Sequence, residues 1–189
     1  LDRIQKLGKK IIICSPSNSN LLNSNQLNLF LQNENVTFID FKLRRYGINP
    51  FQDLLAFIQL CKVITKFKPD LLILYTVKAI LYGSIAKIFT KSKARVYSTI
   101  TGLGYIFISN DKKASLLRPL VKIAYKLALK QNDIVFFQNE DDKKFFISNK
   151  IISKKRSAII NGSGVNLDVY KRSSQLPVGG THLKFVMIS

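Results

Sequence analysis

Four short loops contain the residues of this chain whose types and spacing suit ligand chemistry. Each loop is polar or contains glycine, and each directly follows a segment that we expect to be a β-strand. In an open α/β sheet, ligands bind in the crevice outside the carboxyl ends of the strands. The loops therefore predict a single binding edge, built from residues 75–78, 101–105, 138–142 and 161–165.

The first two loops offer different chemistry. The ammonium group of Lys78 either contacts an anionic ligand or is solvated at the start of a helix. Gly102 and Gly104 lack a Cβ atom, so a ligand can approach the backbone amides around them. A dinucleotide-binding fingerprint is not expected, because Phe107 replaces its third glycine and the next helix should begin well downstream. Two alternatives remain for this loop, a ligand-binding segment and a hairpin-like turn without a ligand.

The last two loops are equally ambiguous. Asn139 is expected to cap a helix, and the acidic residues that follow it are explained by the helix macrodipole. Gly162 and Gly164, on either side of Ser163, can present successive N–H groups to a phosphate as an anion nest. They can equally serve only a tight turn.

The other reactive side chains do not assemble a catalytic or metal-binding group. His182 is the single histidine of the chain and has no companion nucleophile or carboxylate. Cys14 and Cys61 lie in apolar segments, where we expect buried free thiols. One histidine and two cysteines cannot build a usual zinc site, so neither a metal nor a cofactor is expected.

The composition predicts a basic globular domain with an anionic partner. The chain has 189 residues, 47% of them apolar, which suits one domain with a hydrophobic core. Its 30 Lys and Arg residues against 11 Asp and Glu give a net charge of +19. Such a charge favours nucleic acid, a negative membrane surface or a phosphorylated substrate. Lysines interrupt the most apolar region, so no transmembrane helix is expected.

Predicted strands and helices alternate along the chain. A continuous apolar run such as 71–75 is typical of a strand buried on both faces of a parallel sheet. The fold class is therefore predicted to be α/β, a Rossmann-like doubly wound sheet that is mainly parallel. We expect strands at 11–14, 35–41, 71–75, 94–100, 133–137 and 157–160, and helices at 50–68, 79–90, 116–130 and 140–149.

The predicted helix at 116–130 is amphipathic and basic. Its apolar flank is expected to pack on the sheet while its lysines remain in water. The alternative is that the helix docks on anionic lipid, because lysines near such a surface attract it. The apolar flank comprises Leu116, Leu120, Ile123, Leu127 and Ala128, and the lysines are Lys122, Lys126 and Lys130.

Taken in order, these motifs resemble the N-terminal half of a family 4 glycosyltransferase, which has the two-domain GT-B architecture. The matching pieces lie at 49–50, 68–75, 76–83, 100–104, 137–142 and 162–170. The resemblance covers about residues 4 to 189. The nearest subgroup comprises enzymes that build capsule, lipopolysaccharide O-antigen or other polyprenol-linked surface glycans.

The resemblance implies transfer of a sugar from a nucleotide donor, expected to be UDP-linked, with retention of anomeric configuration and no required metal. In that fold the N-terminal domain receives the acceptor and the C-terminal domain holds the donor. The substrate-binding residues that this implies are Lys78, Thr101, Gly102, Gly104 and Asn139, with Gly162, Ser163 and Gly164 near the interdomain hinge.

The chain departs from the family pattern at both ends and in one loop. The family's first strand should precede Asp2, and the donor domain should follow Ser189. We therefore expect an acceptor-side domain over 1–174 that lacks its first strand. Residues 175–189 should form a linker and the first strand of a donor domain, and this chain alone should be inactive. Many members also carry histidine where this chain has Thr101.

The implied partners are a nucleotide-sugar and a lipid-linked glycan acceptor. A place in the bacterial cytoplasm, peripheral on the anionic inner face of the membrane, is consistent with the basic composition. Two alternatives come from other classes, a basic nucleotide- or nucleic-acid-binding α/β module and a gene remnant without function. Nucleic-acid binding is disfavoured, because the sequence shows neither a recognition-helix signature nor interleaved basic and aromatic residues.

Overall fold

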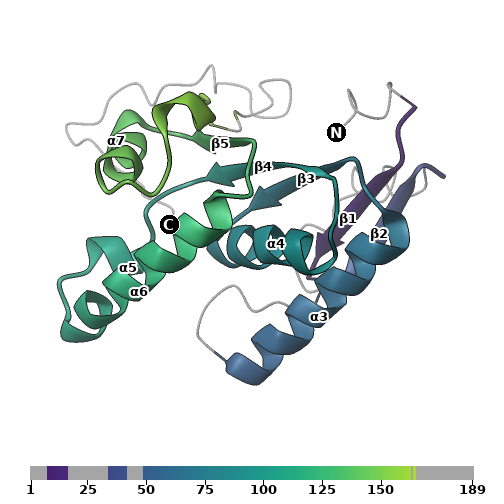
Figure 1. Ribbon diagram of the computed structural model, residues 1–189, viewed down its shortest axis with the longest axis horizontal. Coiled ribbons are helices and arrows are strands. Elements are labelled where there is room, and N and C mark those ends of the chain that lie inside the picture. The colour runs from purple at the N-terminus through teal and green to yellow at the C-terminus, as the bar shows by residue number, and fades with distance from the viewer. Residues whose placement is uncertain (1–7, 17–33, 42–48, 163, 165–189) are drawn as a thin grey trace, which may run out of the picture.

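The computed structural model describes residues 8–16, 34–41, 49–162 and 164 (Figure 1). Strands and helices alternate along this part of the chain, as expected. The elements are β1 (Ile11–Ser15), β2 (Val36–Asp40), α3 (Pro50–Phe67), β3 (Leu71–Tyr75), α4 (Val77–Phe89), β4 (Arg95–Ile100), α5 (Tyr105–Ile108), α6 (Lys112–Leu129), β5 (Ile134–Phe137), α7 (Glu140–Ser148), the 3-10 turn η2 (Lys154–Arg156) and β6 (Ser157–Ile159).

The strands pair in parallel and confirm the α/β class. One sheet has the order β3-β4-β5-β6, and β1 pairs with β2 in a second, two-stranded sheet. In the larger sheet Tyr75 is opposite Thr99, Ile100 is opposite Phe137, and Phe137 is opposite Ile159. Neighbouring strands are parallel and their carboxyl-terminal residues are nearly opposite one another. The carboxyl ends of β3 to β6 therefore lie along one edge of the sheet.

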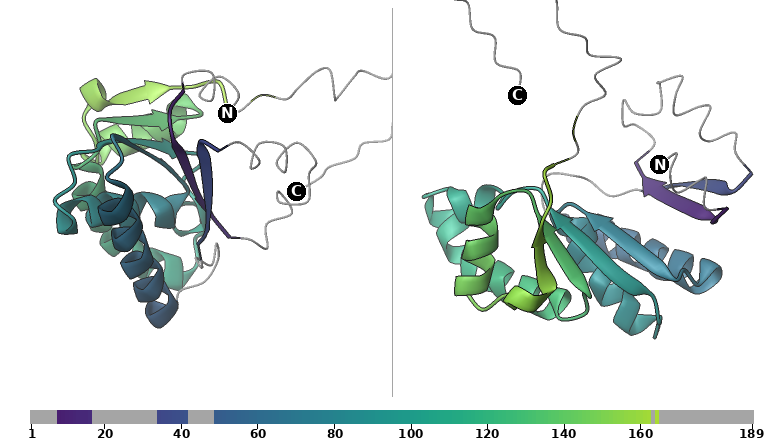
Figure 2. Two further views of the ribbon diagram at one scale, coloured as in Figure 1. Left: turned by 90° about the vertical axis from the view of Figure 1, so that its right-hand side faces the viewer. Right: turned by 90° about the horizontal axis from the view of Figure 1, so that it is seen from above.

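The described helices cover one face of the larger sheet (Figure 2). Alternate strand residues, among them Val96, Val135 and Phe137, point into a core that is closed by Ile80 of α4 and Phe146 of α7. Aromatic rings fill the α7 side of this core: the Phe146 ring lies 5.3 Å from that of Phe137 and 5.2 Å from that of Tyr125. Rings in such edge-to-face contact add to the apolar area that they bury.

The expectation that β3 is buried on both faces is wrong for one face. Leu74 points into the core, but Leu71, Ile73 and Tyr75 are exposed on the opposite side. A continuous apolar run cannot distinguish one covered face from two, because it lacks the alternation that marks a solvated face.

Helix α3 begins and ends where the sequence predicts. The Asn49 side chain accepts a hydrogen bond from the Gln52 N–H at 3.2 Å, which caps the helix before Pro50. Lys68 ends it in the left-handed region, with φ of 44°. The inner face of α3 packs with Phe41, beside β2, in a second apolar cluster.

Helix α6 turns the opposite face to the core from the one expected. Tyr125, Ala128 and Leu129 are buried, together with Ala114 near the helix start. The expected apolar flank points outward instead, apart from Ala128. Both sides of this helix carry apolar residues, so its periodicity alone cannot decide which side meets the sheet.

A buried asparagine joins three elements behind the sheet. The Asn132 amide nitrogen donates to Ser84 Oγ of α4 at 2.8 Å and to the Ala128 carbonyl of α6 at 3.1 Å. Its side-chain oxygen accepts a hydrogen bond from the Ser98 hydroxyl of β4. Every one of these groups is withdrawn from water, so the network must be complete to be stabilising.

We predict that Asn132→Ala lowers the free energy of unfolding by about 2–3 kcal/mol, because it leaves the buried hydroxyls of Ser84 and Ser98 without their partner. Urea denaturation of the purified protein measures the change. The exposed Asn110→Ala serves as control and should stay within about 0.5 kcal/mol of the wild type. An equally small effect of Asn132→Ala would show that the network does not carry this stability.

Tyr125 predicts a pH dependence of stability. Burial raises the pKa of Tyr125 well above its usual range. As pH rises past about 10, the unfolded chain releases this proton while the folded protein keeps it, so the free energy of unfolding falls by up to about 1.4 kcal/mol per pH unit. Tyr125→Phe should remove this part of the slope, whereas Asn110→Ala, which keeps every tyrosine, should not. Equal slopes in the wild type and Tyr125→Phe would contradict the assignment.

Candidate functional site

The candidate site is the edge of the larger sheet at which β3 to β6 end (Figure 1). The strand register brings the four loops of the sequence analysis to this edge at similar heights. The first loop turns at Thr76, which has φ of 74° although it is not glycine. A threonine in this region is strained, and such strain clusters at functional positions.

Lys78, on the first turn of α4, forms an ion pair that the sequence analysis did not identify. Its Nζ lies 2.7 Å from Asp53 Oδ1 of α3, and the two side chains are only 18% and 11% exposed. Lys78 is thus neither solvated at a helix start nor free at the edge, because Asp53 holds it. The acidic residue in the first turn of the Asn-Pro helix was the only signal in the sequence that could have indicated this partner.

Tyr82, one turn along α4 from Lys78, completes this group. Burial raises the pKa of Tyr82, and the negative charge and hydrogen bond of Asp53 act in the same direction. Asp53 therefore interacts with a cation on one side and a neutral phenol on the other. The Lys78–Asp53 ion pair joins α3 to the start of α4, where the first loop ends.

The second loop leaves β4 through Thr101, which is exposed, and turns at Gly104 with φ of +75°. A Cβ atom at Gly104 would meet nothing within 4 Å. Glycine is therefore favoured at this position by backbone conformation and not by lack of space. Gly102 precedes it with similarly open surroundings.

The expectation that the next helix begins well downstream of this loop is wrong. The short helix α5 opens at Tyr105, directly after Gly104. A helix of four residues is not visible as a period in the sequence, which explains why it was missed. The loop still lacks the third glycine of a dinucleotide fingerprint, since Phe107 packs inward against the Phe145 ring at 5.2 Å.

Asn139 caps α7 as predicted. Its side-chain oxygen accepts a hydrogen bond from the Asp142 N–H at 2.7 Å, and its amide nitrogen donates to Asp142 Oδ2 at 3.0 Å. Asp142 is buried, so it does more than complement the helix macrodipole. The cap fixes the direction in which the third loop leaves β5.

The fourth loop leaves β6 with two glycines in the left-handed region. Gly162 and Gly164 each have φ of +66°, and the Gly162 N–H donates to the Ile160 carbonyl at 2.8 Å. Ser163 lies outside the described residues, as do His182 and the predicted linker and strand at 175–189. The anion nest at this loop therefore stays a prediction.

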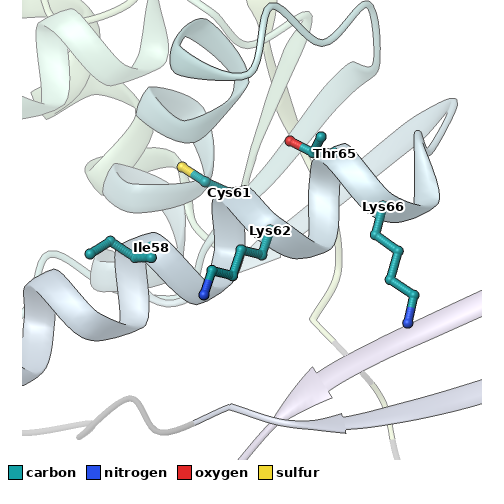
Figure 3. A pocket seen from close by; sticks show the side chains of 5 residues that line it. All are labelled: Ile58, Cys61, Lys62, Thr65 and Lys66. Atoms are coloured by element: carbon teal, nitrogen blue, oxygen red, sulfur yellow. The ribbon is translucent and has the colours of Figure 1, made fainter.

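Among the shallow hollows of the described surface are two to which α3 contributes. The first, of about 490 Å³, is lined by α3 alone, and Figure 3 shows Lys66 extending from it toward the β1–β2 sheet. The second, of about 440 Å³, lies between α3 and α4 and includes Asp53 and Tyr82. Its other lining residues are apolar: Pro50, Leu54, Phe57, Ile85 and Phe89.

The cysteines are unpaired, as expected, but only half-buried. Burial raises the pKa of the Cys14 and Cys61 thiols, which disfavours the reactive thiolate. Among the described residues, no group of three or more His, Cys, Asp or Glu side chains is placed to hold a metal ion. In the same part of the chain, no helix is both long and apolar enough to cross a membrane.

The fold and the strand-end loops define a parallel α/β domain with its polar and glycine-bearing loops at one edge. The glycosyl transferase 4-like family model matches residues 3–139, which is most of the chain. The chain therefore belongs to the glycosyl transferase 4-like family. This confirms the family predicted from the ordered motifs.

A curated relative comes from Campylobacter jejuni subsp. jejuni serotype O:2 and is named N,N'-diacetylbacillosaminyl-diphospho-undecaprenol alpha-1,3-N-acetylgalactosaminyltransferase. The chain is 29% identical to it over 129 residues, which is 68% of this chain and 34% of the relative. The match thus spans about a third of the length of that protein.

We predict that Lys78 and Asp53 stabilise the fold as a coupled pair. In a double-mutant cycle with Lys78→Met and Asp53→Asn, the coupling energy should be about 1–3 kcal/mol, above that of an exposed pair because both side chains are largely buried. Chemical denaturation of the four proteins measures it.

The matched control is the more exposed pair Lys143–Glu140, with Nζ 3.3 Å from Oε1. The cycle of Lys143→Met and Glu140→Gln should give less than about 0.5 kcal/mol. Equal coupling energies in the two cycles would contradict a special role for the Lys78–Asp53 pair.

Proposed function

We propose that this chain is the acceptor-side part of a retaining glycosyltransferase that moves a sugar from a UDP-linked donor to a polyprenol-linked surface-glycan precursor. One observation carries the proposal. Four polar or glycine-bearing loops follow the strands at one edge of the larger sheet, and the chain belongs to the glycosyl transferase 4-like family. The name of the C. jejuni relative supports the acceptor class, since it specifies a saccharide on diphospho-undecaprenol.

The residues at the edge suit an acceptor that carries a diphosphate. A ligand can approach the backbone of Gly102 and Gly104, because no atom lies within 4 Å of where a Cβ would stand. Thr101 adds an exposed hydroxyl beside them. We assign the acceptor diphosphate to this loop, while the Gly162 to Gly164 segment is assigned to the hinge toward the donor.

Lys78 and Asn139 complete the proposed site in different ways. The Lys78 ammonium lies beside the first loop but is held by Asp53, so it acts on an anionic acceptor as a fixed positive charge. Asn139 uses both polar atoms of its side chain in the α7 cap, so it positions the third loop and offers the acceptor its remaining amide hydrogen.

The setting we propose is the cytoplasmic face of a bacterial membrane, with the protein bound peripherally. A lipid-linked acceptor is confined to that surface. The net charge of +19 favours binding to anionic lipid. The glycans that we propose the enzyme helps to build are capsule, lipopolysaccharide or a related glycan.

The test is transfer by the full-length protein in which these residues occur. Undecaprenyl-diphosphate-linked saccharides are incubated with a panel of UDP-sugars, and NMR of the product reports its anomeric configuration. We expect transfer with retention. Inversion would overturn the proposed stereochemistry, and the absence of transfer with every donor and acceptor would overturn the function. The 189-residue chain alone should be inactive, so transfer by it would contradict the proposed separation of acceptor and donor domains.

Gly104→Ala tests the assigned loop within the full-length enzyme. An alanine with positive φ costs about 1–2 kcal/mol, so the loop should shift and kcat/KM for the acceptor should fall about 10-fold or more. The KM for the donor should stay unchanged. Gly8→Ala is the matched control, because Gly8 also has positive φ and open surroundings but precedes β1 and does not follow a strand of the larger sheet. An equal fall of kcat/KM in the two variants would contradict the assignment of the acceptor diphosphate to this loop.

A further inference from the structure

An apolar stripe runs along the outer face of α6. At 100° per residue, Leu116 and Tyr125 lie on opposite sides of the helix. Tyr125 is buried in the core, so the stripe faces away from the protein. Its side chains are more than half exposed: Leu116 80%, Leu120 63%, Ile123 57% and Leu127 62%.

Helix α5, which packs on the inner side of α6 through Arg118 and Tyr125, adds two further exposed apolar side chains. Tyr105 and Ile108 are 66% and 69% exposed, and they lie at the start of the same α5–α6 unit (Figure 1). Four large apolar side chains therefore form one row on α6, and α5 has two more on its own surface. Exposed apolar groups of this number are typical of an interaction surface, whereas single exposed leucines need no explanation.

The α5–α6 unit holds this stripe outward through internal contacts. The Arg118 guanidinium donates to the Ile106 and Ser109 carbonyls at 3.1 and 2.7 Å, and the Tyr105 hydroxyl bonds to Asp111. On the inner side, Phe107 packs against the Tyr125 ring. These contacts fix α5 against the inner side of α6. The stripe on the outer side therefore stays exposed.

Lysines surround the stripe. Lys112 and Lys113 lie at its beginning, Lys126 on its flank and Lys130 at its end, and all are exposed. Arg118 and Lys122 are used internally, since Lys122 donates to Asn149. Asp111 is the single acidic residue between 105 and 131, and it is engaged by Tyr105 and by the α6 cap.

We propose that the outer face of α6 docks the protein on an anionic lipid bilayer. Leucine and isoleucine side chains would enter the boundary between headgroups and acyl chains, while the four free lysines contact anionic headgroups. The charge pattern favours lipid over a second copy of this chain, because two copies would bring their lysine clusters together. For its biological setting the inference rests on the proposed function, since a bilayer is where a polyprenol-linked acceptor resides.

Vesicle sedimentation of the full-length protein tests the docking face. We expect binding to vesicles of phosphatidylglycerol mixed with phosphatidylcholine, and much weaker binding to phosphatidylcholine alone. Leu120→Ser with Leu127→Ser should weaken binding about 10-fold or more, because both side chains lose apolar area to the bilayer. Lys126→Gln with Lys130→Gln should weaken it about 10- to 30-fold and reduce its sensitivity to salt.

Matched control variants remove the same chemistry elsewhere on the surface. Phe51→Ser with Leu55→Ser removes two exposed apolar side chains from α3. Lys93→Gln with Lys155→Gln removes two exposed charges outside the face. Both controls should bind within about twofold of the wild type. Losses equal to those of the α6 variants would overturn the proposal, because they would indicate unspecific attraction to the whole basic surface.

Two further outcomes would also overturn the proposal. The first is a dimer in lipid-free sedimentation that Leu120→Ser with Leu127→Ser dissociates, which would make the stripe an interface between copies. The second is salt-sensitive binding to single-stranded polynucleotide that exceeds binding to anionic vesicles and is lost in the lysine variant. Unchanged circular dichroism of each variant shows that the fold is intact.

Transfer assays separate this proposal from the proposed function. On a short-chain, water-soluble acceptor the leucine variant should retain wild-type turnover, and on vesicle-embedded acceptor it should lose about 10-fold or more. Vesicle binding that depends on the stripe without any sugar transfer would leave the docking face standing and overturn the function. If the leucine variant transfers sugar to vesicle-embedded acceptor as fast as the wild type, the proposed function stands and the docking face is overturned.

Discussion

The corner between α6 and β5 determines how the larger sheet is assembled. Asp133 accepts a hydrogen bond from the Val96 N–H at 2.8 Å and returns one to the Val96 carbonyl at 2.9 Å, which fixes β5 against β4. One residue earlier, Asn132 ties this corner to α4 and α6. Since a slip of one residue reverses every side chain in a strand, these polar contacts decide which residues reach the core and at what height each loop leaves the edge.

The loops of the edge owe their shapes to conformations that few residues adopt. Gly104, Gly162 and Gly164 have positive φ in open surroundings, and Thr76 adopts positive φ without the freedom of glycine. The strands behind these segments hold them in place, although nothing packs within 4 Å of where a Cβ of the glycines would stand. The Lys78–Asp53 pair adds a second constraint, because it joins the start of α4 to α3 and so fixes the helix that leaves the strained turn.

Local signals in the sequence were sufficient for most element boundaries and for the caps. Asn49 and Asn139 cap their helices as expected, and the strand at 71–75 has the bounds that its apolar run indicates. Long-range contacts could not be predicted, as the partnership of Lys78 with Asp53, 25 positions away, demonstrates. The orientation of α6 failed for another reason: with apolar residues on both sides, only the packing of Tyr125 against the Phe146 ring determines the inner side.

The same packing couples the candidate acceptor loop to the outer stripe. Gly104 turns the chain from β4 directly into α5, and Arg118 then fixes α5 on α6, so the loop and the exposed leucines belong to one stiff unit. A ligand with a charged head and a long apolar tail suits such a unit, which has an accessible glycine loop at one end and exposed apolar side chains beyond it. The strained Thr76 turn and the exposed leucines of α6 are each unfavourable alone, and the proposed docking on a bilayer accounts for the leucines.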